Sequence, residues 1–87
     1  MRLKVEYGKR QLVANFPGDG PVSVGQVLQA VQNEYPEMRH IWCDSEGCFD
    51  GSLLVFINGE HMRYRKGLDT RLQEGDEIYV IPIIAGG

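Results

Sequence analysis

The residues of this chain that could do chemistry most directly lie at its end, in the heptapeptide IPIIAGG. Gly86 and Gly87 have no side chains to bury, and chain ends of this kind are usually frayed and dispensable. Two glycines can also enter a narrow cleft without side-chain clashes and adopt whatever backbone angles it demands. Pro82 restricts the segment before them, so such an arm would project away from the domain. These residues alone leave two readings open for residues 82–87, a disordered chain end or a flexible functional tail.

A second set of reactive side chains comprises His40, Cys43 and Cys48. All three are suitable zinc ligands, and His61 could supply a fourth. Their spacing, His-x2-Cys-x4-Cys, matches no strong zinc motif, and a [2Fe–2S] cluster would need four thiolates. We therefore predict no metal site and two free thiols on a loop, as expected in a reducing cytosol. Zinc held by these three residues is the weaker alternative.

Composition restricts the class of protein. A chain of 87 residues suits one small domain, in which an interior catalytic cleft would compete with the core for space. The net charge of −3 disfavours non-specific nucleic-acid binding. No apolar run approaches the roughly 20 residues that span a bilayer, and the first residues, MRLKVEYGKRQ, form no signal peptide. We predict a cytoplasmic protein that is not an enzyme by itself and has neither nucleic-acid nor membrane partners.

The first half of the chain predicts a hairpin followed by a helix. Apolar and polar residues alternate over residues 2–16, interrupted by a two-residue turn at Gly8–Lys9 with glycine first, which suits a type II′ turn. Ser23 is a good N-cap, and Gln26 completes a capping box. The helix that follows carries one apolar stripe and ends at Pro36. The stripe consists of Val24, Val27, Leu28, Val31 and Tyr35.

The second half predicts a loop and further strands. Residues 38–51 show no clean period and read as a loop with short local structure. The run SLLVFI at 52–57 predicts a strand buried on both faces or nearly so, and Asn58–Gly59 is a strong hairpin signal before a return strand over 60–65. The remaining elements are a short helical turn in KGLDTRL anchored by Leu68 and Leu72, a turn in QEGDE and a last strand in IYVIPI.

This order of elements predicts an α+β fold with a mixed sheet and one main helix. The ubiquitin-like β-grasp fold has the same order, and in it the last strand lies beside the first at the middle of the sheet. We therefore predict a β-grasp domain over residues 1–81, from whose central strand the tail 82–87 leaves.

The last 35 residues or so resemble those of the ubiquitin-like sulfur-carrier proteins. This family includes the small subunit of molybdopterin synthase, the thiazole-forming sulfur carrier and the carrier of an alternative cysteine synthesis. The shared pattern is a strand ending in Asn-Gly, then GLDT-L, GDE, an apolar strand, a proline and a terminal Gly-Gly. In this chain the elements are Asn58–Gly59, Gly67 to Leu72, Gly75 to Glu77, residues 78–81, Pro82 and Gly86–Gly87.

The resemblance implies a protein co-substrate rather than an enzyme. An adenylating enzyme of the ubiquitin-activating type would use ATP to activate the Gly87 carboxylate, and no cofactor would be bound by the carrier itself. A sulfur donor, commonly a persulfide, would then convert the adenylate to a thiocarboxylate. That group would supply sulfur to a biosynthetic acceptor enzyme. The GLDT-L and GDE pattern favours the molybdopterin type slightly over the cysteine type.

Partner enzymes would have to grip the domain near its tail. Ile83 and Ile84 are adjacent in sequence and cannot both face one core, so at least one is expected at a docking surface with Pro82 and Ala85. Closing the edge of the core is the other reading of Ile83. Arg63, Arg65 and Lys66 form a basic cluster with a docking role, although most clusters of this kind are only solvated.

Two other functions share parts of this pattern. A ubiquitin-like modifier would be joined through Gly87 to lysines of other proteins, after the same activation chemistry. A structural assembly domain is the third reading, because phage tail assembly proteins contain related β-grasp domains. Those domains typically continue past the corresponding glycines, which makes the third reading the least favoured.

Overall fold

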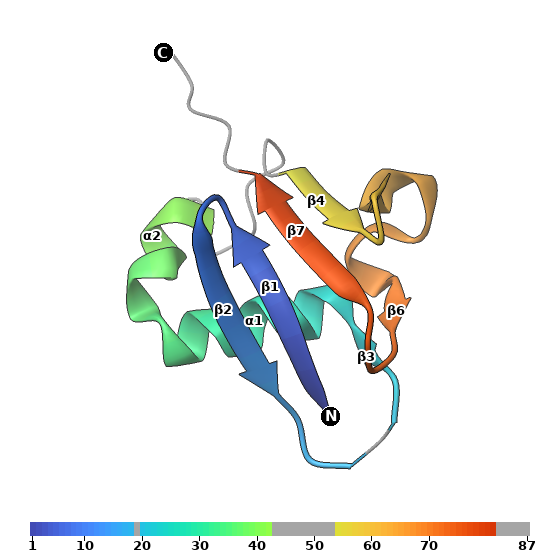
Figure 1. Cartoon of the computed structure of the whole chain (residues 1–87), viewed down its shortest axis with the longest axis horizontal. Helices are drawn as coiled ribbons and strands as arrows, with labels where there is room; N and C mark the ends of the chain where they lie inside the picture. The colour runs from blue at the N-terminus through green and yellow to red at the C-terminus, as the bar shows by residue number, and fades with distance from the viewer. Residues whose placement is uncertain (19, 43–53, 82–87) are drawn as a thin grey trace.

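The fold is built on a five-stranded sheet with one long helix packed across one of its faces (Figure 1). The computed structural model describes residues 1–18, 20–42 and 54–81. The five-stranded sheet has the order β2-β1-β7-β4-β5, and β3 and β6 form a separate two-stranded sheet. The strands are β1 (Arg2–Tyr7), β2 (Arg10–Asn15), β3 (Val22–Ser23), β4 (Leu54–Ile57), β5 (Glu60–His61), β6 (Arg71–Leu72) and β7 (Glu77–Ile81). The helices are α1 (Val24–Glu34) and α2 (Arg39–Trp42), with 3-10 turns η1 (Pro36–Met38), η2 (Met62–Tyr64) and η3 (Gly67–Asp69).

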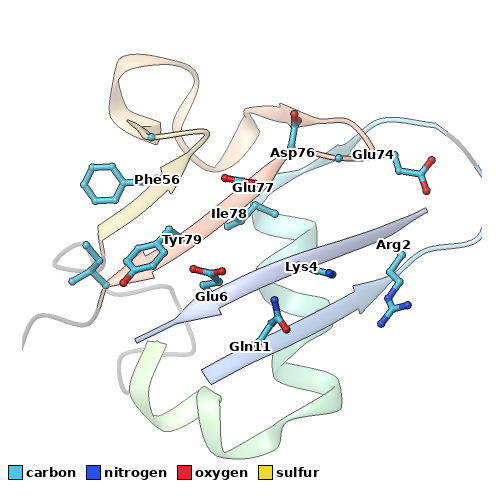
Figure 2. A pocket seen from close by; sticks show the side chains of 13 residues that line it. Arg2, Lys4, Glu6, Gln11, Phe56, Glu74, Asp76, Glu77, Ile78 and Tyr79 are labelled. Atoms are coloured by element: carbon cyan, nitrogen blue, oxygen red, sulfur yellow. The ribbon is translucent and has the colours of Figure 1, made fainter. Parts of the chain in front are cut away.

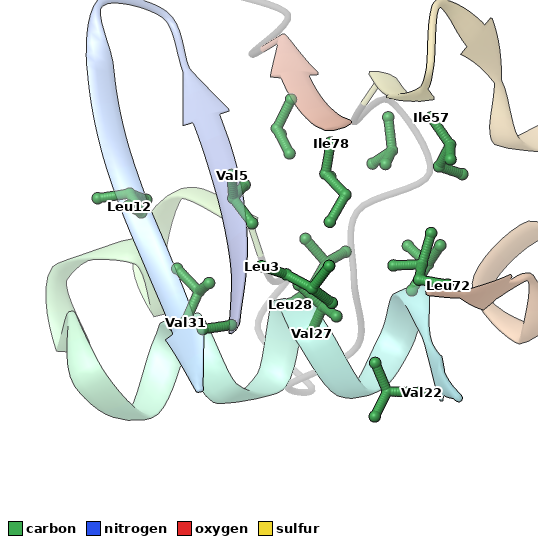
Figure 3. Packing of buried hydrophobic residues seen from close by; sticks show 14 of the residues in the cluster. Leu3, Val5, Leu12, Val22, Val27, Leu28, Val31, Ile57, Leu72 and Ile78 are labelled. Atoms are coloured by element: carbon green, nitrogen blue, oxygen red, sulfur yellow. The ribbon is translucent and has the colours of Figure 1, made fainter. Parts of the chain in front are cut away.

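The core lies between α1 and the inner face of the sheet (Figure 3). Alternate residues of each long strand point into it, because successive side chains of a strand face opposite ways. The sheet contributes Leu3, Val5, Leu12, Ala14, Val55, Ile57, Ile78 and Val80, and the helix contributes Val24, Val27, Leu28 and Val31. The predicted apolar stripe of the helix is therefore confirmed, with Tyr35 half-buried just beyond its end.

Helix α1 begins at the predicted capping box. The Ser23 hydroxyl accepts a hydrogen bond from the Gln26 N–H at 3.1 Å, and the Gln26 side chain accepts one from the Ser23 N–H at 2.8 Å. These bonds satisfy two of the donors that a helix start leaves unpaired, and a cap of this kind contributes about 1 kcal/mol to stability. The helix ends at Glu34, before Pro36, as predicted.

Both predicted hairpin turns are present. Gly8 has a φ of +60°, and Lys9 is not among the residues with positive φ, which fits a turn that needs the left-handed region only at its first position. Asn58 and Gly59 both have positive φ, 51° and 87°, as a type I′ turn requires. The two turns set the registers Tyr7↔Arg10 and Ile57↔Glu60.

The last described strand occupies the middle of the sheet, which confirms the predicted β-grasp topology. β7 pairs in parallel with β1 and antiparallel with β4. A parallel neighbour requires a crossover connection, and α1 provides it by crossing the inner face behind β1 and β2 (Figure 1). Ile81 is therefore the last residue of the central strand of the five-stranded sheet.

Two predictions about strands in the second half were wrong, one in the length of the strand and the other in its burial. The return strand ends at His61 and does not run to Arg65, because the His61 side chain accepts the Arg63 N–H at 2.9 Å and starts the turn η2 instead. β4 is buried on one face only: Val55 and Ile57 are inaccessible, whereas Leu54 and Phe56 are half-buried. No described helix covers the outer face of the sheet, so its apolar residues stay partly exposed there.

The turn η3 is anchored differently from the prediction. Leu72 is buried, as expected, but the Leu68 side chain is 37% exposed. η3 approaches α1 through its backbone, since a Cβ added to Gly25 would lie 3.4 Å from the Leu68 carbonyl oxygen. The short β3–β6 pair, with Val22 opposite Leu72, was not predicted because two-residue strands leave no periodic signal.

The segment predicted as a loop contributes two core residues. Met38 and Trp42 are fully buried, at the end of η1 and of α2. The Trp42 ring packs 5.6 Å from the Tyr7 ring, centroid to centroid. Burial raises the pKa of the Tyr7 hydroxyl, an effect that the Trp42 side chain and then Arg10 oppose. Trp42 Nε1 nevertheless has no acceptor at hydrogen-bonding geometry among the described residues.

Candidate docking and transfer site at the end of the central strand

β7 sets the position of Ile81, the last described residue before the predicted tail. The start of this strand is held by the β4–β5 turn: the Asn58 side chain accepts the Glu77 N–H at 2.9 Å and donates to the Asp76 carboxylate at 3.1 Å. The Asn58 N–H also donates to the Glu77 carbonyl at 2.8 Å. Since β7 is paired on both sides up to Val80, its last residue, Ile81, is a well-anchored root for whatever follows.

The predicted tail itself lies outside the described residues. This applies to the partner-binding candidates Pro82, Ile83, Ile84 and Ala85 and to the reactive pair Gly86 and Gly87. The roles predicted for them remain predictions, as does the division at residue 81.

Beside that root, the outer face of the sheet forms an open hollow of about 850 Å³, which we call the outer-sheet surface (Figure 2). Its large apolar lining residues are Phe56, Ile78, Tyr79 and Ile81, of which Ile78 is buried in the core. Phe56 and Tyr79 are cross-strand partners, and Tyr79 and Ile81 are 40% and 36% exposed. Charged side chains that also line the hollow are Arg2, Lys4, Glu6, Glu74, Asp76 and Glu77.

The balance of charge on this surface is acidic. Four of the lining side chains are carboxylates and two are cationic. Glu6 lies next to Tyr79 in the register of β1 and β7, so negative charge borders the apolar part directly. A partner that fits this surface would present an apolar patch with basic residues at its margin.

The outer-sheet surface was not predicted from the sequence, although a signal for it exists. In EIYVI, Ile78 and Val80 are in phase with the core, so Tyr79 and Ile81 must face the other way. Large apolar residues on an exposed strand face suggest an interface when a cross-strand neighbour such as Phe56 extends them.

The basic cluster lies apart from this hollow. Arg63 is in η2, while Arg65 and Lys66 follow it, and none of them lines the outer-sheet surface. Arg65 forms an exposed ion pair with Glu60, Nε to Oε1 at 3.0 Å. Exposed pairs of this kind contribute little to stability. The cluster could therefore serve only as a separate contact, with part of its charge already compensated.

His61, considered above as a possible fourth zinc ligand, is half-buried. Its ring packs edge-on against Phe56 and Tyr64, with centroid distances of 5.3 and 6.4 Å. Nδ1 accepts the Arg63 N–H, so the hydrogen-bond network assigns the ring proton to Nε2. Nε2 is inaccessible and has no hydrogen-bond partner among the described residues. These contacts give His61 the role of a cap for η2, not of a catalyst.

The weaker zinc prediction falls largely outside the described residues. His40 lies in α2, with its side chain not described, and Cys43 and Cys48 lie beyond the described range. Within residues 1–18, 20–42 and 54–81, no group of three or more metal-binding side chains comes together. In the same residues, no helix has the length and apolar character needed to cross a membrane.

The fold and the site together define a ubiquitin-like β-grasp domain with a partly apolar, exposed sheet face beside the end of its central strand. Residues 11–87 match the ThiS family, so the chain belongs to that family and the predicted kinship with sulfur carriers is confirmed. Members of this family are small protein co-substrates and not catalysts.

Individual relatives agree with this assignment. A putative sulfur carrier protein of Archaeoglobus fulgidus is 46% identical over 33 residues, which cover 38% of each chain. Sulfur carrier protein CysO of Mycobacterium tuberculosis is 27% identical over 67 residues, which cover 75% of this chain and 72% of CysO.

Solved structures confirm the fold. SAMP1 from Haloferax volcanii superposes with a TM-score of 0.82 at 22% identity, covering 100% of both chains. Small archaeal modifier protein 1 from Methanosarcina acetivorans has a TM-score of 0.79 at 26% identity, covering 99% of this chain and 96% of that protein.

Proposed function

We propose that this protein is a sulfur carrier whose Gly87 carboxylate is adenylated by an activating enzyme and then converted to a thiocarboxylate. The observation that carries the proposal is the family match, which continues through the tail to residue 87. The anchored root at Ile81 supports it, because a substrate arm has to leave the domain from a fixed point.

The proposed chemistry needs two displacements. The Gly87 carboxylate attacks the α-phosphorus of ATP and releases pyrophosphate, which gives an acyl-adenylate. A sulfur nucleophile then attacks the acyl carbon, and AMP leaves. Hydrosulfide would give the thiocarboxylate directly, whereas a persulfide would give an acyl disulfide whose S–S bond a thiol must cleave. The activating and acceptor enzymes supply catalysis, and this chain supplies recognition and the carboxylate.

For the acceptor, we keep the order that the sequence patterns favour. A molybdopterin-type acceptor comes first and a cysteine-synthesis type next. Purified thiocarboxylate offered to each class of acceptor enzyme would distinguish them by which one consumes it.

A ubiquitin-like modifier joined to lysines through Gly87 is the second candidate function. The similarity to the archaeal modifier protein of Methanosarcina acetivorans favours it, because that relationship covers nearly the whole of both chains. The first step, activation of Gly87, is common to both functions. High-mass isopeptide adducts that survive thiol treatment would indicate the modifier. Transfer of sulfur from the thiocarboxylate to a small acceptor molecule, without added thiol, would indicate the carrier.

The proposal is tested by intact mass spectrometry after incubation with ATP, an adenylating enzyme and a sulfur source. We expect a mass gain equal to one oxygen replaced by sulfur, located on the C-terminal peptide after proteolysis. The enzyme must first be shown to activate its own carrier. An unchanged mass with that competent enzyme would contradict the carrier function.

Docking on the outer-sheet surface makes a separate prediction. Tyr79 is 40% exposed and lines the outer-sheet surface together with Ile81, so Tyr79→Ala should remove an aromatic anchor of about 2 kcal/mol. That loss corresponds to about a thirtyfold lower kcat/KM for activation. Steady-state pyrophosphate release at varied carrier concentration measures it.

Tyr64→Ala is the matched control for that variant. Tyr64 is 74% exposed but does not line the outer-sheet surface, so the same truncation should leave kcat/KM unchanged. Equal effects of the two substitutions, or none at Tyr79, would refute docking through this surface.

A further inference from the structure

The two edges of the five-stranded sheet differ in length. At one edge lies β5, with two residues, and at the other lies β2, with six. Natural sheets protect their edges with short strands, prolines or charges, since a free edge can pair with another strand. β5 is protected by its shortness. β2 contains no proline, and its only charged residue is Arg10, at its first position.

The hydrogen bonds of β2 show which of its backbone groups are free. The Phe16 N–H donates to the Met1 carbonyl at 2.8 Å, and the Met1 ammonium donates to the Phe16 carbonyl at 2.6 Å. Hydrogen-bonded and non-bonded pairs alternate along an antiparallel ladder. With the observed register, the even-numbered residues of β2 therefore bond to β1. The N–H and C=O groups of Gln11, Val13 and Asn15 point away from β1, toward an edge without another described strand.

A groove of about 180 Å³ runs beside this free edge, between β2 and the C-terminal part of α1. Its lining residues are Val13, Ala14, Asn15, Ala30, Glu34 and Tyr35. The wall contributed by Ala30 is small and apolar. Glu34, by contrast, is exposed and has no ion-pair partner among the described residues, whereas its neighbour Glu37 pairs with Arg10 at 3.5 Å. The groove therefore combines room for an aliphatic side chain with an unpaired negative charge.

We propose that the β2 edge is a second docking site, which binds an extended peptide segment of a partner protein by strand addition. The outward backbone groups of Gln11, Val13 and Asn15 would pair with the segment. An aliphatic side chain of the segment would occupy the groove next to Ala30, and a lysine or arginine would lie near Glu34. The segment is therefore defined by an extended backbone, by side chains that alternate between the two faces of the sheet, and by a basic residue placed to reach Glu34.

A second copy of this chain fits the edge less well. In an antiparallel pair of β2 strands, the side chains facing the groove would be Leu12 and Ala14 of the other copy. These residues are 1% and 2% exposed because they are buried in their own core, so they cannot fill the groove. A partner's extended segment has no such restriction.

The β2 edge meets the outer-sheet surface only at Gln11, whose side chain lines that hollow. β1 lies between β2 and β7, and neighbouring strands are about 4.8 Å apart, so a segment on the edge would leave Tyr79 and Ile81 uncovered. One partner could therefore hold the carrier by its edge while another enzyme receives the tail.

The site can be tested with the full chain and a short capped peptide that alternates valine and threonine and carries a lysine at each end. NMR titration should give saturable amide shifts at Gln11, Val13 and Asn15. Hydrogen exchange of these three amides should slow by about tenfold or more at saturation, since they alone gain partners. A peptide N-methylated at alternate residues, which cannot donate those bonds, should not bind.

Two variants complete the test. Val13→Pro removes an outward N–H that β1 does not use, so the fold should persist while peptide affinity falls by about tenfold or more. Glu34→Gln should weaken binding of the lysine peptide but not of its uncharged analogue. Unchanged exchange at the three amides, shifts confined to Phe56 and Tyr79, or protection that depends only on protein concentration would each overturn the proposal. No ATP or activating enzyme is present, so this outcome is independent of the sulfur-carrier proposal.

Discussion

Deletion of Gly87 should abolish thiocarboxylate formation and leave thermal unfolding unchanged. The deletion still leaves a terminal carboxylate, on Gly86, but moves it back by about 3.5 Å along an extended chain. Reacting atoms have to approach to within about 3–3.5 Å in a productive complex, so a displacement of this size removes the carboxylate from the adenylation site. Glycine has no side chain to contribute to the core, which is why the melting temperature should not move.

The measurement combines intact mass, pyrophosphate release and a melting curve on the same preparations. Gly87→Ala is the matched control for chain length, because it restores the reach and adds only one methyl group. It should retain more activation than the deletion, with the remaining deficit reporting how narrow the cleft is. Thiocarboxylate on the shortened chain at the wild-type rate would refute Gly87 as the reactive residue.

Trp42→Ala should be the most destabilising single substitution among the described residues. Trp42 is fully buried, and its ring packs against Tyr7 at an interplanar angle of 56°. Replacing a buried tryptophan with alanine costs about 3–5 kcal/mol through lost burial and the cavity left behind. A domain of this size has a total stability of about 4–13 kcal/mol, so a substantial unfolded population is expected near 37 °C.

Trp42→Phe provides the matched control. It keeps an aromatic ring in the same space and removes Nε1–H, a buried donor without a partner among the described residues. Most of the buried ring volume is retained and only this N–H is lost, so this variant should lose much less stability than Trp42→Ala. Urea unfolding followed by far-ultraviolet circular dichroism measures both. Equal stability of the alanine variant and the wild type would show that α2 does not contribute to the cooperative core.

Elements with strong local signals were predictable from the sequence. The turn at Gly8–Lys9, the Asn58–Gly59 turn and the capping box at Ser23 each depend on residues a few positions apart. The alternation in β1 and the stripe of α1 then fix which face is buried, and the order of elements fixes the topology. These signals agree with one another, and such agreement makes a fold readable from a single chain.

The errors arose where tertiary contacts decide the conformation. The His61 side chain competes for the Arg63 N–H and ends a strand that its sequence pattern would have extended. Trp42 sits in a stretch without periodicity, so nothing local distinguishes it from a loop residue, although it is fully buried. The continuous apolar run of β4 indicated burial on both faces. On the outer face, however, Phe56 lines the outer-sheet surface and is only half-buried.

The candidate site was predictable in part. The tail chemistry of Gly86 and Gly87 was inferred from the sequence pattern and stays a prediction, because both residues lie outside the described range. The surface beside the tail depends on Phe56 and Tyr79 becoming neighbours across β4 and β7, two strands separated by a hairpin and two short turns. Local sequence patterns do not show which residues of two distant strands become cross-strand neighbours, so this surface could not be predicted before the fold was known.

The place of β7 also has a consequence during protein synthesis. The strand at the middle of the sheet is the last of the described strands to leave the ribosome, so β1 and β4 have no common partner until residues 77–81 have emerged. A chain that stops earlier leaves both strands with open edges over an incomplete core, and such chains are prone to aggregation and degradation. A partner that recognises the assembled sheet therefore selects molecules whose translation has already passed the root of the tail.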